Sequence, residues 1–234
     1  MKDRQTVVLL PGFDGTGLLM QGFARVLADR FTVWTIAYPC DQAYDYDALT
    51  KYVLERLPDD EYILIGESFS GPLVLRIAAE NPPGLMGVVL GASFARLDLP
   101  FKMIVSSLAK MISVRRVPMM VLNSLLMGGQ STPDQRALLR EALKRVSPHV
   151  LTARLKAALS VDLIHADLTV SKPLLYLRAT EDKLIPKNAA NWIALVAGNR
   201  CIREVRAPHF LFQTAPEECR RILIDCLGMF SPSF

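Results

Sequence analysis

Six short apolar runs, separated by segments with helical periodicity, constrain the fold of this chain more than any other feature. Each run is rich in Val, Ile, Leu or Tyr without a clean polar–apolar alternation, which is typical of strands buried on both faces of a sheet. Because these strands alternate with helices, the sequence predicts a doubly wound parallel α/β sheet with helices on both faces. The predicted strands span residues 6–10, 32–37, 62–65, 87–90, 173–177 and 201–205.

Helical patterns fill the intervals, at residues 18–28, 46–57 and 72–80. The third has Pro72 in its first turn, where a missing backbone N–H costs nothing, and it ends before the Asn-Pro-Pro-Gly sequence that begins at Asn81. The sequence thus supplies the crossover helices that parallel strands need.

One interval is much longer, because about eighty residues separate the fourth predicted strand from the fifth. Helical patterns occupy residues 103–111, 117–127, 133–146 and 149–159 of it. An insertion here lies at the carboxyl edge of the sheet, where ligands bind in open α/β folds. We expect a helical lid over a pocket, here called the lid segment (residues 94–168). The alternative is a set of extra helices that complete a large domain.

Length and composition favour one globular domain. The chain has 234 residues, and we expect a single domain over residues 1–234 with the lid segment inside it. The hydrophobic share of 51% and the charged share of 21% exclude a disordered or collagen-like chain. No apolar stretch reaches the roughly 20 residues of a membrane span. The N-terminus mixes charges and runs into a strand, unlike a signal peptide, which favours a cytoplasmic location.

The sequence gives no sign of a metal, a cofactor or a nucleic-acid partner. Its four cysteines form no CxxC pair, and three histidines are too few for a multi-histidine site. The net charge of +4 is too small and dispersed to indicate nucleic acid. Cys219 and Cys226 share one face of an apolar helical pattern, so we expect buried free thiols there rather than a disulfide.

Ser68 lies where a predicted strand meets a predicted helix, within the sequence Gly66-Glu-Ser-Phe-Ser-Gly71. A serine with very small residues two positions before and after it can occupy a sharp turn that presents its hydroxyl above the sheet. Gly66 satisfies the first position, and Ser70 stands where a second glycine is usual. The bare pattern arises often by chance, but its strand-to-helix context favours a nucleophile.

A serine nucleophile needs a histidine base and a carboxylate that orients the histidine. After a strand-turn-helix serine the expected chain order is serine, acid, histidine. Glu181 and Asp182 follow the fifth predicted strand, and His209 follows the sixth. The order is therefore satisfied.

These segments resemble the α/β-hydrolase superfamily, and the turn around Ser68 is similar to that of its small serine carboxylesterases. The resemblance extends from Thr6 to the final helix. The family's Asp-x-aliphatic-aliphatic-Pro signature falls on the five residues from Asp182, which implies Asp182 as the acid. Glu181 is an alternative, and so is Asp98, because some members place their acid after the fourth strand.

The same resemblance implies His209 as the catalytic base. His149 follows a proline at a helix start and His165 lies in the lid segment, so both fit surface or structural positions better. The loop after the first strand looks like the family's first βα loop, which implies an oxyanion hole made by the backbone N–H groups of Phe13 and Phe69. The alternative is a phosphate-binding loop, although the glycine spacing fits neither common motif.

Many members of the superfamily begin with two extra strands. Only five residues precede the first strand here, so we expect six parallel strands in the order 2-1-3-4-5-6. The resemblance implies serine-dependent hydrolysis of carboxylic esters through an acyl-enzyme, without a cofactor. The alternatives are the same triad acting on thioesters, C–C bonds or peracids, and a receptor-like protein that binds a ligand with little turnover.

Methionines are concentrated in the first part of the lid segment and fit an adaptable acyl pocket, although ordinary lid packing explains them equally well. Because four modest helices cover a limited groove, we expect short to medium acyl chains. The candidate pocket residues are Met103, Met111, Met119, Leu122 and Met127.

The lid segment is positively charged, with eleven basic and five acidic residues between positions 94 and 168. A positive field at a pocket entrance attracts anionic partners. The charge therefore fits either an acidic carrier protein that presents an ester, with Arg115 and Arg116 as contact residues, or plain solubility of an apolar lid.

Overall fold

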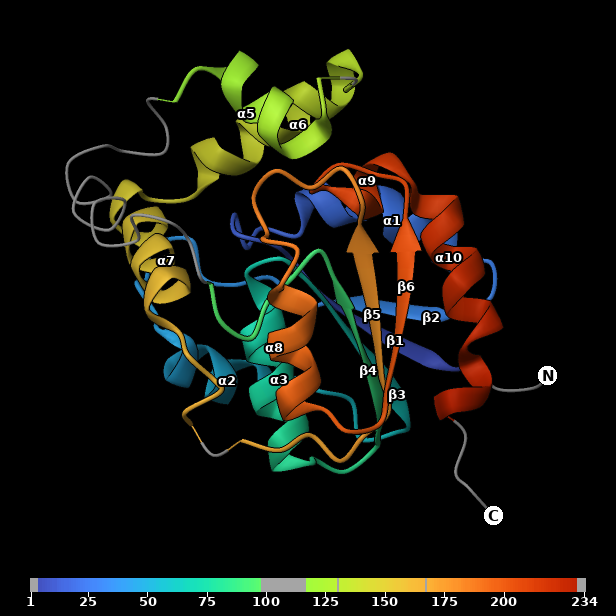
Figure 1. The fold of residues 1–234 in the computed structure, drawn as a ribbon. Coiled ribbons are helices and arrows are strands. Elements are labelled where there is room, and N and C mark those ends of the chain that lie inside the picture. The colour runs from blue at the N-terminus through green and yellow to red at the C-terminus, as the bar shows by residue number, and fades with distance from the viewer. Residues whose placement is uncertain (1–3, 98–116, 130, 167, 231–234) are drawn as a thin grey trace.

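Six parallel strands form one central sheet in the computed structural model, which describes residues 4–97, 117–129, 131–166 and 168–230. The strand order is β2-β1-β3-β4-β5-β6, as predicted (Figure 1). The strands are β1 (Thr6–Leu10), β2 (Thr32–Thr35), β3 (Tyr62–Glu67), β4 (Leu85–Gly91), β5 (Leu174–Ala179) and β6 (Arg200–Val205).

The prediction that every strand is buried on both faces is wrong for the two edges of the sheet. The four inner strands are almost wholly buried, whereas most residues of β2 and β6 are partly or fully exposed. Trp34 on β2 and Ile202 on β6 even count among the exposed large apolar residues. An edge strand has a neighbour on one side only, and the helices cover it incompletely.

Helices cover both faces of the sheet (Figure 1), and a separate hydrophobic core lies on each face. Val7 and Leu9 of β1 point to one face and Val8 and Leu10 to the other, as the pleat requires. The first face carries α1 (Gln21–Leu27), α9 (Leu211–Thr214) and α10 (Pro216–Asp225), and the second carries α2 (Tyr46–Leu54), α3 (Ser70–Glu80) and α8 (Ala189–Val196). A 3₁₀ turn, η1 (Leu18–Met20), precedes α1, and another, η3 (Leu227–Phe230), follows α10.

In the described part of the interval between β4 and β5, three helices lie over the carboxyl ends of the strands (Figure 1). They are α5 (Met119–Met127), α6 (Pro133–Arg145) and α7 (Pro148–Ser160). The start of α6 is fixed by a capping box, in which Thr132 and Gln135 exchange side-chain and backbone hydrogen bonds. The helix predicted at 103–111 lies outside the described residues.

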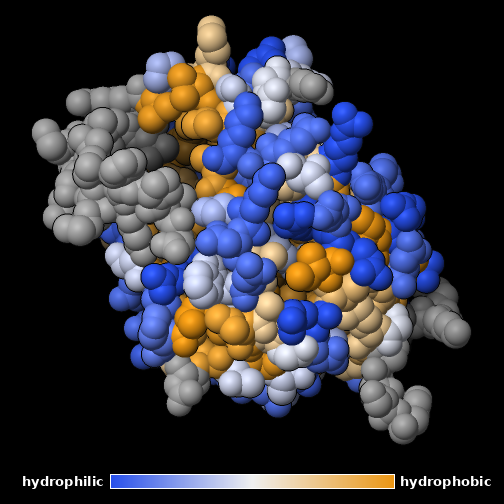
Figure 2. Space-filling model, in the orientation of Figure 1, coloured by the Kyte–Doolittle hydropathy of each residue, from blue (hydrophilic) through white to orange (hydrophobic). Residues whose placement is uncertain are grey.

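The lid helices have a small core of their own, in which Met127, Leu139 and Val150 pack with Leu19 and Phe210 of the main body. Figure 2 shows apolar surface over α5. It comes from Met120 and Val121, which are 83% and 45% exposed. The helices α5, α6 and α7 therefore pack against the main body through this core, and α5 exposes apolar side chains to solvent.

No helix of the described residues is both long and apolar enough to cross a membrane. The four cysteines form no disulfide; Cys219 lies in the first turn of α10 and Cys226 directly follows that helix, and both are buried.

Candidate active site

The turn between β3 and α3 holds Ser68 in a strained backbone conformation, with a φ of 50°. Such a turn is possible because Gly66 has no side chain: a Cβ there would lie 2.5 Å from Val74. The Ser68 N–H donates to the Gly91 carbonyl of β4 at 2.9 Å, which fixes the turn to the sheet. The hydroxyl of Ser68 is thereby presented at the carboxyl edge of the sheet.

Ser70, which stands where a second glycine is usual, is fully buried and makes two hydrogen bonds. Its hydroxyl donates to the Pro11 carbonyl oxygen and also meets the Tyr38 hydroxyl. The position that demands a glycine is Gly71, where a Cβ would lie 1.7 Å from the Ser93 hydroxyl. The departure at position 70 therefore links the Ser68 turn to the loop after β1.

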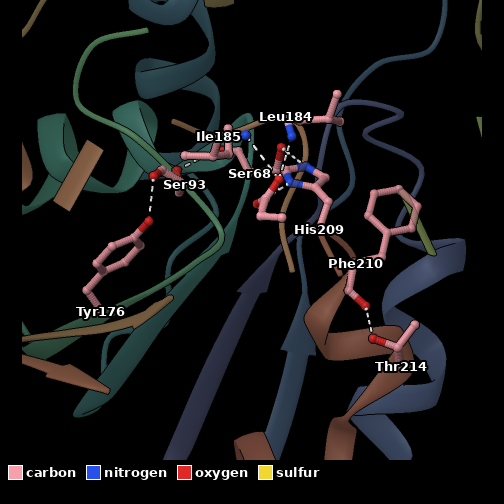
Figure 3. A network of polar contacts seen from close by, with 9 residues as sticks. Ser68, Ser93, Tyr176, Leu184, Ile185, His209, Phe210 and Thr214 are labelled. Carbon is pink, nitrogen blue, oxygen red and sulfur yellow. Dashed lines mark hydrogen bonds and ion pairs between the residues drawn. The ribbon is translucent and has the colours of Figure 1, made fainter. Parts of the chain in front are cut away.

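His209, in the loop between β6 and α9, lies beside Ser68 (Figure 3). Its Nε2 is 2.8 Å from the Ser68 Oγ, and its Nδ1 is 2.8 Å from the Asp182 Oδ2. The side chains of His209 and Asp182 are only 3% and 6% exposed. The three predicted residues, far apart in the chain, are thus joined in one hydrogen-bonded series.

Asp182 rather than Glu181 faces the histidine. The Oδ1 of Asp182 accepts hydrogen bonds from the backbone N–H groups of Leu184 and Ile185, at 2.7 and 3.0 Å, which leaves Oδ2 for His209 (Figure 3). Glu181 is exposed and pairs with Arg206 at 3.3 Å. Asp98, the other alternative, lies outside the described residues.

The other two histidines lie on the surface of the lid helices or after them. His149 contacts the Asp41 carbonyl oxygen at 3.1 Å, and His165 pairs with Asp162 at 3.0 Å. Neither touches the Ser68–His209–Asp182 series.

The rings of Phe13 and Phe69 meet edge to face, with their centroids 6.3 Å apart. Both line the cavity in front of Ser68. Within the described part of the chain, no hydrogen bond occupies the backbone N–H of either residue. Two backbone donors are therefore free to bind an oxygen atom of a ligand.

The cavity in front of Ser68 has a volume of about 280 Å³ and is almost entirely apolar. Asp14, Ser68 and His209 supply its only polar side chains among the described residues. The rest of the described lining is aromatic or aliphatic: Phe13, Leu19, Phe69, Phe94, Leu97, Leu122, Leu126, Leu139, Leu143, Leu155, Ala158, Leu159, Leu184, Ile185 and Phe210.

Of the five predicted pocket residues, Leu122 lines this cavity. Met119 lines a neighbouring surface hollow, and Met127 packs in the lid core beside another, so neither lies where it was predicted. The reason is the rotation of α5, which directs Leu122 and Leu126, one turn apart, toward Ser68. Met103 and Met111, like Arg115 and Arg116, lie outside the described residues.

Sequence reasoning missed a buried carboxyl group beside the site. Glu67, immediately before Ser68, is 1% exposed and accepts a hydrogen bond from Gln213 Nε2 at 3.0 Å. The pKa of Glu67 is raised to about 8, mainly by burial; the hydrogen bond from Gln213 lowers it, and the nearby Asp14 contributes a smaller increase. Burial also raises the pKa of Asp14. The sequence did offer one indication of this buried acid, because Glu67 closely follows the apolar run that was predicted to be a buried strand.

Comparison with known proteins points to one family. Residues 7–222 match the sequence profile described as the alpha/beta hydrolase family. Phytyl ester synthase 2 (chloroplastic) of Arabidopsis thaliana is 34% identical over 83 residues, which are 32% of this chain and 12% of that protein. Phytyl ester synthase 1 is 32% identical over 88 residues, again 12% of its length. The chain thus spans only a small part of these curated relatives.

Solved structures show the same fold at low sequence identity. An enol-lactonase from Burkholderia xenovorans LB400 superposes with a TM-score of 0.82 at 16% identity, covering 97% of this chain and 92% of that one. A hydrolase from Oleispira antarctica gives 0.81 at 17% identity, covering 96% and 91%. With the profile match over nearly the whole chain, these findings establish that the protein belongs to the alpha/beta hydrolase family.

Proposed function

We propose that this hydrolase cleaves carboxylic esters with Ser68 as its nucleophile. The observation that carries the proposal is the buried series Ser68–His209–Asp182, which opens on an apolar cavity. A serine in hydrogen-bond contact with a histidine, itself oriented by a carboxylate, is the arrangement that activates a hydroxyl for acyl transfer.

In the proposed reaction, the Ser68 Oγ attacks the carbonyl carbon of the ester while its proton passes to His209 Nε2. The carbonyl oxygen becomes an oxyanion and accepts hydrogen bonds from the backbone N–H groups of Phe13 and Phe69. Asp182 stabilises the imidazolium through Nδ1. His209 then protonates the departing alcohol, and water attacks the acyl-enzyme by the same route.

The cavity supports the proposed preference for short to medium acyl chains. Its volume of about 280 Å³ lies at the small end of the range for ligand pockets, and its lining offers an acyl chain apolar contacts. A carrier-bound ester remains a prediction that rests on the positive charge of the lid segment alone.

A second candidate function is acyl transfer from the same acyl-enzyme to an alcohol. Two observations favour it: the partial relatives are named phytyl ester synthases, and the described lining of the cavity has only three polar side chains to hold a hydrolytic water. Adding hexanol to a p-nitrophenyl ester assay discriminates the two, because transfer yields a hexyl ester and hydrolysis yields the acid.

The proposal is tested with p-nitrophenyl butyrate and hexanoate. We expect Ser68→Ala to lower kcat by at least about 10³-fold, since the nucleophile is lost while the cavity remains. Matched thioester and β-diketone substrates assayed beside the esters separate the alternative chemistries. Faster turnover of those substrates than of the esters would reassign the reaction, and wild-type ester turnover by Ser68→Ala would reject the mechanism.

A further inference from the structure

A buried arginine of the lid segment forms hydrogen bonds with the backbone of the loop after β1. Arg154 of α7 is 2% exposed. Its Nη1 donates to the Phe13 carbonyl oxygen at 3.2 Å and to that of Asp14, and its Nη2 donates to the Pro39 carbonyl oxygen at 2.9 Å. Three backbone carbonyls on two separate segments are thus held by one side chain.

The partners of this guanidinium are unusual for a buried charge. Buried arginines are normally paired with carboxylates, because an isolated charge is costly to remove from water. Among the described residues no carboxylate forms an ion pair with Arg154. Its hydrogen bonds go to backbone carbonyls instead, two in the loop after β1 and one at Pro39, so the buried guanidinium helps to fix the geometry of that loop.

The loop is built to admit the guanidinium. Gly15 has a φ of 70°, and a Cβ at this position would lie 2.5 Å from Arg154 Nη1. On the far side, the Tyr38 ring lies 5.6 Å from the guanidinium carbon, and the Tyr38 N–H donates to the Gly15 carbonyl oxygen at 2.7 Å. Glycine at position 15 therefore lets the arginine, the tyrosine and the loop pack as one unit.

These contacts fix both peptide planes that flank Phe13. The Phe13 N–H shares its peptide plane with the Gly12 carbonyl, whose oxygen accepts a hydrogen bond from the Gly15 N–H at 3.0 Å. The next plane contains the Phe13 carbonyl, which Arg154 holds directly. Without the guanidinium, the second plane loses its partner, and the Gly15 end of the turn loses its packing.

We propose that Arg154 is a positioning residue that holds the Phe13 N–H toward the substrate carbonyl and so ties the oxyanion site to the lid segment. This inference rests on the proposed function, since it concerns the same acyl transfer. Arg154 itself touches no reacting atom. A donor displaced by as little as 1 Å loses much of its effect on the transition state, with about 100-fold losses in rate for misplacements of that size.

The test compares Arg154→Lys and Arg154→Ala with Lys156→Met, a change at an exposed residue of the same helix. Lysine keeps the charge but lacks the planar fork that reaches several carbonyls at once. For p-nitrophenyl butyrate we expect kcat to fall at least about 10-fold in Arg154→Lys and further in Arg154→Ala, with KM within about two-fold of wild type. Lys156→Met keeps the wild-type constants.

Two further measurements distinguish a displaced Phe13 N–H from a general disturbance of the structure. The inhibition constant of an aliphatic trifluoromethyl ketone, which forms an oxyanion on Ser68, should rise by the same factor as kcat falls. The constant of the matching methyl ketone should stay unchanged. Methylguanidinium added at millimolar concentration should restore part of the kcat of Arg154→Ala and have no effect on Lys156→Met.

Wild-type kcat in Arg154→Lys and Arg154→Ala, or a loss confined to KM, would overturn the inference. If Arg154→Ala does not fold, Arg154→Lys alone tests the inference, and an unchanged kcat in Arg154→Lys would overturn it. A different result would reject the proposed function. If the wild-type protein cleaves no ester and binds no trifluoromethyl ketone, both the ester hydrolysis and the role of Arg154 are rejected. An active wild type with inactive Ser68→Ala and normal Arg154 variants rejects the role of Arg154 alone.

Discussion

Glu67 and Gln213 meet side chain to side chain inside the protein, with the Gln213 Nε2 donating to the Glu67 Oε2 at 3.0 Å. The Oε1 atom of each residue is buried and has no hydrogen-bond partner within the described residues. A protonated carboxyl group suits such a buried pair, because one oxygen can accept from the amide N–H while the other carries an O–H donor. The raised pKa of Glu67, about 8, agrees with a neutral acid at pH 7.

This pair makes stability depend on pH. The pKa of Glu67 is about 8 in the folded state against an ordinary 4.5, so between these values the native state keeps a proton that the unfolded chain has lost. Stability therefore decreases as pH rises from about 5 to 8, by up to about 1.4 kcal/mol per pH unit from this group. We expect Glu67→Gln to flatten the decline.

The measurement is urea unfolding at pH 5, 6, 7 and 8. Glu181→Gln serves as the control, because Glu181 is exposed. Equal slopes for the wild type and Glu67→Gln would show that Glu67 is ionised at neutral pH.

Ser70→Ala removes a hydroxyl group that joins the Ser68 turn to Pro11 and Tyr38. The buried Pro11 carbonyl and Tyr38 hydroxyl then lose a partner, so we expect a loss of about 1–3 kcal/mol in the free energy of unfolding. Ser124→Ala, at an exposed position of α5, should change it by less than about 0.5 kcal/mol. Chemical denaturation measures both, and equal stabilities of the two variants would refute a bridging role for Ser70.

Asp182→Asn should lower kcat for p-nitrophenyl butyrate by roughly 10²–10⁴-fold, since an amide no longer stabilises the imidazolium or holds the right tautomer. Glu181→Gln should stay within about two-fold of wild type, because Glu181 pairs with Arg206 at the surface. Steady-state kinetics of the two variants decide between the neighbouring acids. A large loss in Glu181→Gln with a normal Asp182→Asn would reverse the assignment.

Leu122→Trp should narrow the cavity in front of Ser68, since Leu122 lines it. We expect kcat/KM for p-nitrophenyl hexanoate to fall at least about 10-fold while that for the acetate changes little, because one or two lost methylene contacts already cost that much. Met120→Trp, on the 83% exposed neighbour, is the matched control. The same loss for both esters would mean that the acyl chain binds elsewhere.

The parallel sheet could be predicted from the sequence because the alternation of strands and helices is visible in the order of consecutive segments. The proximity of Ser68, Asp182 and His209 could be expected for a similar reason: each follows a strand, and strand ends converge at one edge of the sheet. The exposure of β2 and β6 was missed because it depends on which strands lie at the edges.

What escaped prediction depends on contacts between distant segments. The rotation of α5 decides that Leu122 rather than Met119 faces Ser68, and periodicity alone does not fix it. In the sequence, Arg154 looks like any other polar residue of a helix, and only its contacts with Phe13 and Pro39 distinguish it. Buried polar groups of this kind are specified by partners more than a hundred residues away.

The most direct test of the account is labelling with a fluorophosphonate probe, followed by mass mapping of the labelled peptide. We expect one probe per molecule, attached to Ser68, with labelling abolished in Ser68→Ala and slowed at least about 100-fold in His209→Ala, which loses the base that activates the hydroxyl. Probe attached to another residue, or Ser68→Ala labelled at the wild-type rate, would contradict it.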